Sequence, residues 1–152
     1  MGYTFGVGRE APTFTLANYD GGSVTLKDFR GDWLPVLIFF RPDHPDAGKR
    51  LAALSASADQ FWGLRGQVLA LALASAEELG RLAADVPALA FPLLVDEGAR
   101  IARAYGAYNR TKGAVSAATY IVDRAGKIVW VGEGEEAYRP ASLIAALENI
   151  AR

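Results

Sequence analysis

The feature that most restricts the fold of this chain is the alternation of short, continuous apolar runs with segments of helical periodicity. The run Trp33 to Phe40 is too short for a typical helix and lies between a Gly-Asp and an Arg-Pro pair, which favours a central strand buried on both faces. Val68 to Ala74 is a second such run, and a helical pattern separates the two. This alternation predicts an α/β fold.

Capping residues predict where the helices begin. Apolar residues recur at helical spacing over Asp46 to Trp62, and the first residue of this segment is expected to cap the helix with its side chain. Ser75 is expected to cap the next helix, with Glu78 completing a capping box. Asp96 is expected to cap a short helix, and Pro140 to open the last one.

Turn residues separate the remaining runs, and Arg110 to Gly113 is expected to form a loop. Further strands are expected at Phe14 to Leu16, Ser23 to Leu26, Phe91 to Val95, Thr119 to Val122 and Ile128 to Val131. No linker, repeat or charge block interrupts the 152 residues, of which 51% are hydrophobic. We therefore expect one domain over residues 1–152.

The composition excludes several kinds of chemistry. The chain has no cysteine, which excludes disulfides, cysteine-ligated metal centres and every mechanism that needs a thiolate. Its single histidine, His44, excludes zinc sites with two or three histidine ligands. We accordingly expect no metal and no cofactor. With 16 basic and 17 acidic residues, the formal net charge of −1 favours no nucleic-acid partner.

The sequence shows no targeting or membrane signal. Met1 to Pro12 has neither a basic region nor an apolar core of the kind found in a secretory leader. The longest apolar stretches, Trp33 to Phe40 and Val86 to Val95, are well short of the roughly 18 to 20 residues that span a bilayer. We expect a soluble cytoplasmic protein without a membrane partner.

Several segments, in this order along the chain, resemble one known family. They are Ala11 to Leu16, Asp20-Gly21 with Val24 to Gly31, Val36 to Pro42, Phe91 to Asp96, Ala104 to Gly106, and Thr119 to Ile128. Together they resemble the peroxiredoxin family, the alkyl hydroperoxide reductase and thiol-specific antioxidant group. The resemblance implies a thioredoxin-like fold with the peroxiredoxin-type central mixed sheet and helices on both faces.

The resemblance also identifies active-site positions, and most of them are changed here. The family pattern after the central strand is Pro, three residues, Thr or Ser, two residues, and the peroxidatic Cys. This chain keeps Pro42 but has Asp46 at the Thr position and Lys49 at the Cys position. The family's activating Arg lies three residues before an aromatic residue of a later strand, which here is Tyr120, so its position falls on Ala117.

These changes imply a degenerate member of the family. A peroxidatic thiolate takes an oxygen from peroxide to become a sulfenic acid that thiols reduce again, and lysine has no such oxidation cycle. We therefore expect a pseudoenzyme that is inactive as a thiol peroxidase and acts as a binding or assembly module. An antioxidant or oxidoreductase role would then rest on homology only.

A polar cluster after the central strand leaves an alternative open. Asp43, His44, Asp46 and Lys49 lie where α/β folds commonly place their sites, although each is also explained as a solvated loop or helix-start residue. In the alternative, Lys49 binds a small anionic substrate and His44 acts as acid or base. That requires both side chains to converge in one pocket. A metal held by Asp43, His44 and Asp46 is less favoured, because adjacent loop residues rarely converge on an ion.

The same cluster predicts weak binding of inorganic anions. Lys49 in the first turn of a helix favours a negative ligand, but a capping Asp46 carboxylate would occupy the backbone N–H groups that such a ligand needs. We therefore expect weak phosphate binding, if any.

Aromatic residues predict association. Family members commonly pair through loops around the active site or through the sheet edge, and the matching segments here carry Tyr105, Tyr108 and Trp130. We expect a homodimer, with Tyr108 as the first candidate for the interface.

Overall fold

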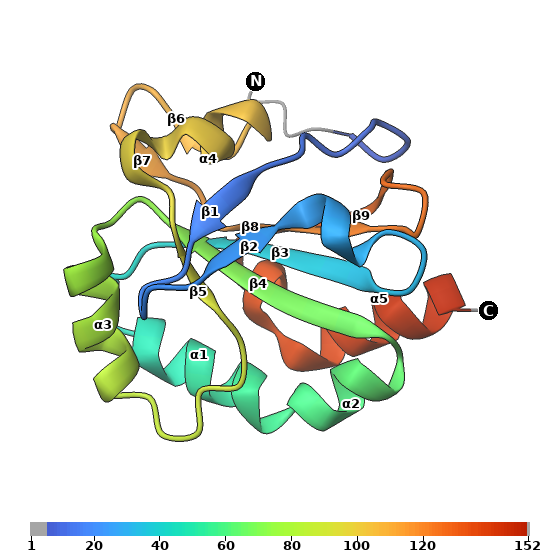
Figure 1. Cartoon of the computed structure of the whole chain (residues 1–152), viewed down its shortest axis with the longest axis horizontal. Helices are drawn as coiled ribbons and strands as arrows, with labels where there is room; N and C mark the ends of the chain where they lie inside the picture. Colours follow the sequence, from blue (N-terminus) through green and yellow to red (C-terminus); the bar gives the residue numbers. More distant parts are fainter. Residues whose placement is uncertain (1–5, 152) are drawn as a thin grey trace.

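A mixed sheet of five strands in the order β5-β4-β3-β8-β9 forms the centre of the computed structural model (Figure 1). Its strands are β3 (Leu34–Phe40), β4 (Gly66–Ala72), β5 (Leu93–Val95), β8 (Ala118–Val122) and β9 (Ile128–Glu133). β4 is parallel to both β3 and β5, whereas β8 is antiparallel to β3 and β9. Each strand overlaps a predicted run, so the α/β prediction is confirmed.

The structure describes residues 6–151. Residues 1–5, which begin the segment without a targeting pattern, and residue 152 lie outside the described residues, as do the corresponding ends of the predicted domain. Within the described part of the chain, no helix has the length and apolar character needed to cross a bilayer.

Helices cover both faces of the sheet (Figure 1). The α-helices are α1 (Ala47–Ala56), α2 (Ala58–Gly63), α3 (Ala76–Ala84), α4 (Arg100–Ala104) and α5 (Pro140–Ala151). Helices α1, α2, α3 and α5 bury apolar side chains on one face, and α4 packs on the other face. Short 3₁₀ helices, η1 (Leu26–Phe29), η2 (Glu97–Ala99) and η3 (Gly134–Tyr138), connect these elements.

The central strand β3 is buried along its whole length, as predicted from its continuous apolar run. Because strand side chains alternate between faces, Val36 and Ile38 pack toward α1, α2 and α5, and Leu37 and Phe39 pack toward α4. Each fully buried aliphatic or aromatic side chain of this kind contributes roughly 1.5 to 3 kcal/mol through the hydrophobic effect. This burial holds the carboxyl end of β3 in place, and the loop that follows this end carries most of the candidate site residues.

Two small hairpins complete the strands. β1 (Thr15–Ala17) and β2 (Ser23–Thr25), which overlap two of the expected strands, form an antiparallel pair. β6 (Tyr108–Asn109) and β7 (Ala114–Val115) pair around the predicted loop, and their pairing was not expected from the sequence. Strands of two residues are too short to show an alternating pattern.

Helical capping agrees with the sequence in two places. The Ser75 hydroxyl accepts the Glu78 backbone N–H at 3.1 Å, as predicted for α3. The buried Asp96 carboxylate accepts the N–H groups of Ile101 and Ala102 at 3.0 and 2.9 Å. It therefore caps α4, but from across the η2 turn, in which Ala99 adopts a left-handed conformation with φ of 56°.

The predicted helix Asp46 to Trp62 is instead two helices. α1 ends at Ala56 and α2 begins at Ala58, and Ser57 between them has φ of −98° and ψ of 7°. The Ser57 N–H bonds to the carbonyl of Leu54, which tightens the last turn of α1. The helical spacing of apolar residues continues through Ser57, so the sequence pattern gave no indication that the helix is interrupted there.

Candidate functional site

The loop between β3 and α1 holds most of the predicted site residues. Two backbone turns close it: the His44 N–H donates to the Arg41 carbonyl at 3.2 Å, and the Ala47 N–H donates to the His44 carbonyl at 3.1 Å. The loop follows the carboxyl end of a central strand, where α/β folds place their sites. It leads directly into the first turn of α1, which carries Lys49 and Arg50.

Asp43 is engaged by its neighbour Arg41. The guanidinium donates from Nη2 to Oδ2 at 3.1 Å and from Nε to Oδ1 at 3.3 Å. The hydrogen bond from Arg41 lowers the pKa of the Asp43 carboxyl below its usual value. Both side chains are exposed, so the pair shapes the loop more than it stabilises the fold.

His44 is also used within the loop. Its Nδ1 accepts the backbone N–H of Asp46 at 3.0 Å. Nδ1 is thus the acceptor of this contact. His44 is thereby held against the backbone of its own loop.

The prediction that the Asp46 carboxylate caps α1 is wrong. Asp46 stands at the N-cap position, but its side chain makes no capping hydrogen bond. Its backbone has φ of −95° and ψ of 5°, whereas a capping residue needs the extended conformation that Ser75 adopts in α3. The Asp46 carboxylate therefore does not occupy the backbone N–H groups at the start of α1, as the expectation of blocked anion binding required.

The residues that the family pattern predicts at the active site do not line one cavity. Lys49 and Asp46 border an open groove, whereas Ala117 borders a separate cleft together with Arg41. Pro42 borders a third hollow with Asp43. His44 lines none of these three, so the structure does not bring His44 and Lys49 together.

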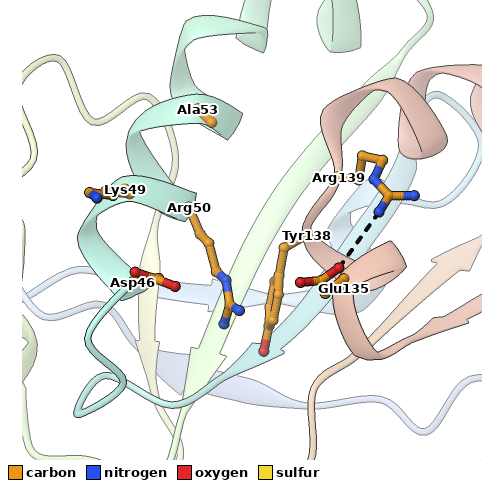
Figure 2. A pocket seen from close by; sticks show the side chains of 7 residues that line it. All are labelled: Asp46, Lys49, Arg50, Ala53, Glu135, Tyr138 and Arg139. Atoms are coloured by element: carbon orange, nitrogen blue, oxygen red, sulfur yellow. Dashed lines mark ion pairs between the residues drawn. The ribbon is translucent and has the colours of Figure 1, made fainter.

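Lys49 itself is exposed and lies on the outer side of α1. Figure 2 shows its side chain directed away from Tyr138, while the neighbouring Arg50 reaches toward that ring. A side chain placed in this way is not desolvated, and desolvation is a common means of making a lysine nucleophilic.

The groove is the feature that the sequence did not predict. It has a volume of about 470 Å³ and lies between α1 and the segment formed by η3 and the start of α5 (Figure 2). Its lining residues come from these two remote segments: Asp46, Lys49, Arg50, Ala53, Glu135, Tyr138 and Arg139. No local sequence pattern could have predicted the groove, because it forms only where two segments that are remote in the sequence come together in the folded chain.

Tyr138 organises one wall of the groove. Its hydroxyl donates to the Phe39 carbonyl at 3.0 Å, and the Arg50 guanidinium carbon lies 4.5 Å from its ring centroid. Burial raises the pKa of Tyr138 to about 12, despite the opposing charges of Arg50 and Arg41. The phenol is therefore a neutral structural donor at physiological pH and not a base.

The described residues do not assemble a metal site. Within residues 6–151, no three His, Cys, Asp or Glu side chains form a group that could hold an ion, so Asp43, His44 and Asp46 do not converge. The candidate site instead contains basic side chains, Lys49, Arg50 and Arg139, that border an open groove.

Comparisons with known proteins agree with the geometry of the fold. The AhpC/TSA family model matches residues 7–131. The chain is 32% identical over 130 residues to "Putative peroxiredoxin Rv2521" of Mycobacterium tuberculosis, covering 80% of this chain and 81% of that protein. It is 27% identical over 159 residues to a peroxiredoxin of Thermoplasma volcanium, covering 96% of this chain and 71% of that protein.

Solved structures show the same fold. Mycobacterium tuberculosis AhpC superposes with a TM-score of 0.86 at 20% identity, covering 97% of this chain and 94% of that one. Peroxidoxin BcpB from Mycobacterium tuberculosis superposes with a TM-score of 0.83 at 22% identity, covering 95% and 97%. The sheet with helices on both faces is thus the thioredoxin-like fold that the resemblance implied.

Proposed function

Because the chain belongs to the AhpC/TSA family and yet contains no cysteine, we propose that it acts as a binding or assembly module and not as a thiol peroxidase. The observation that supports this proposal is that Lys49, which the family pattern predicts at the position of the peroxidatic thiol, is exposed. Lysine forms no sulfenic acid, so peroxide cannot be reduced through that position by thiol exchange.

The surroundings of Lys49 support the same proposal. A peroxidatic thiolate needs a nearby cation and a hydroxyl that holds the peroxide. Here Ala117 supplies no cation and borders a different cleft, and Asp46 places a carboxylate where the family has a hydroxyl. The two positions that the family pattern gives to thiol activation are therefore changed, as well as the position of the thiol itself.

The alternative enzyme, with Lys49 binding an anion and His44 acting as acid or base, is not favoured. His44 is held by the Asp46 backbone N–H and does not border the groove that Lys49 borders. An acid or base must lie within hydrogen-bond reach of the group it serves.

A peroxidase assay tests the proposal. The purified protein should consume neither hydrogen peroxide nor an organic hydroperoxide above a buffer blank when a thiol reductant is supplied. A steady-state rate that survives removal of contaminating peroxidases and metals would refute the proposal.

Restoring the thiol should restore only part of the chemistry. Lys49→Cys should react slowly with peroxide, because Ala117 supplies no cation at the position that the family pattern gives to the activating arginine. Adding Ala117→Arg and Asp46→Thr should raise the rate by about tenfold, as expected if the thiol pKa falls by about one unit. Lys49→Ser is the matched control and should remain inactive. Equal rates for Lys49→Cys and the triple variant would show that Ala117 and Asp46 are not the limiting changes.

A further inference from the structure

The groove between α1 and η3 carries an excess of positive charge. It is bordered by three basic side chains, Lys49, Arg50 and Arg139, and by two acidic ones, Asp46 and Glu135. Arg139 is paired with Glu135, whose Oε2 lies 3.8 Å from Nη2. The remaining positive charge is therefore that of Lys49 and Arg50, which both belong to α1.

Arg50 is the basic group that is held in place without a polar partner. Its guanidinium carbon lies 4.5 Å from the centroid of the Tyr138 ring, and that ring is fixed by the hydrogen bond to the Phe39 carbonyl. Within residues 6–151, the Arg50 side chain makes no ion pair and no hydrogen bond, in contrast to Arg41 and Arg81, which have Asp43 and Glu77.

A guanidinium that is stacked on a ring and has no polar partner can bind an acceptor with two oxygens. Stacking on an aromatic face restricts its orientation and leaves the N–H donors at its edge available. A planar fork of donors matches the two oxygens of a carboxylate, and a pre-oriented fork loses less freedom on binding. Figure 2 shows the guanidinium beside the Tyr138 ring, within the groove.

We propose that this groove binds the carboxylate group of a small molecule, with Arg50 as the bidentate donor and the Tyr138 ring as its support. The inference rests on the proposed binding function and names its ligand class. The nearby carboxylate of Asp46, which has no ion-pair partner within residues 6–151, favours a singly charged group over a phosphate dianion, because it repels each added negative charge. Ala53 adds an apolar contact for the rest of the molecule.

Chemical-shift titration tests this site, with acetate as the simplest probe and sodium chloride added to constant ionic strength. Acetate should shift the Arg50 Nε–Hε resonance saturably, with a Kd of about 1 to 50 mM, as expected for one exposed charge-assisted pair. Phosphate at a pH where it is a dianion is the second probe and should bind more weakly. Absence of a saturable acetate shift, or tighter binding of the phosphate dianion, would overturn the proposal.

Variants distinguish a site from general electrostatic attraction. In the variants, binding is followed through the backbone amide resonances of the groove residues Ala53 and Tyr138. Arg50→Ala should weaken acetate binding at least about fivefold, and Arg50→Lys should also weaken it, since an ammonium cannot form the bidentate pair. Arg100→Ala removes the same charge from α4, on the other face of the sheet, and should leave the affinity unchanged. Equal losses in the Arg50→Ala and Arg100→Ala variants would refute a specific site.

The peroxidase assay and the titration fail independently. Peroxide turnover by the unaltered protein would refute the proposed function, whereas an absent acetate shift in a protein without turnover would refute only this ligand class.

Discussion

At the scale of single residues, Tyr138 connects the groove to the core. We expect Tyr138→Phe to lower the free energy of unfolding by about 1 to 2 kcal/mol at pH 7, because the Phe39 carbonyl loses its donor. The ring remains, so the Arg50 contact should persist. Urea denaturation measures the loss. Tyr19→Phe, which removes a hydroxyl from a half-buried ring, is the control and should change the stability much less.

The pH dependence of stability offers a second measurement on the same residue. The folded protein holds the pKa of Tyr138 at about 12, above the value of about 10 in an unfolded chain. Stability that depends on the neutral phenol is complete below pH 10 and is lost as the pH rises toward 12. Tyr138→Phe should therefore lose less stability than the unaltered protein between pH 10 and 12. An identical loss in both proteins would contradict the assigned burial effect.

At the scale of secondary-structure elements, the starts of α1 and α3 differ although both have a good capping residue type. Ser75→Ala should lower the free energy of unfolding by about 1 kcal/mol, since the Glu78 N–H loses its acceptor. Asp46→Ala should cost much less, because its carboxylate makes no capping bond. Thermal or urea unfolding of both variants measures the contrast. Equal costs would show that Asp46 caps α1 in solution.

At the scale of the whole molecule, the sheet edge offers a surface for association. β9 is the outermost strand of the five-stranded sheet, and within residues 6–151 the segment 8–11 lies beside its beginning, where Gly8 and Arg9 form backbone hydrogen bonds with Ile128. Strand edges of this kind pair readily with a second copy. We predict a homodimer through β9, in which Val131→Lys shifts sedimentation toward the monomer while a thermal melt confirms folding.

The aromatic candidates for the dimer interface have different positions in the structure. Tyr105 is fully buried, and its hydroxyl donates to the Pro12 carbonyl, so the expectation that it contacts a partner is wrong. Tyr108 has the Arg103 guanidinium 4.0 Å from its ring centroid, which already covers one face. Tyr108→Ala should therefore leave the dimer intact. A dimer lost in that variant, or only monomer at high micromolar concentration, would contradict the β9 interface.

The sequence by itself determined the elements whose causes are local. The continuous apolar run of β3 requires burial on both faces, and the Ser75 hydroxyl lies three residues from the N–H that it accepts. The absence of cysteine is likewise read directly from the sequence, and the family pattern predicts Lys49 at the thiol position.

Only the tertiary structure decided the site. Tyr138 meets Arg50 because β3 lies beside β8 in the sheet and α5 returns across the same face as α1, an arrangement that no short window of sequence contains. Asp46 fails to cap because capping depends on backbone conformation, which the turns of the preceding loop set, and not on residue type alone. Contacts between remote segments depend on strand order and loop geometry, so the groove and its guanidinium became visible only in three dimensions.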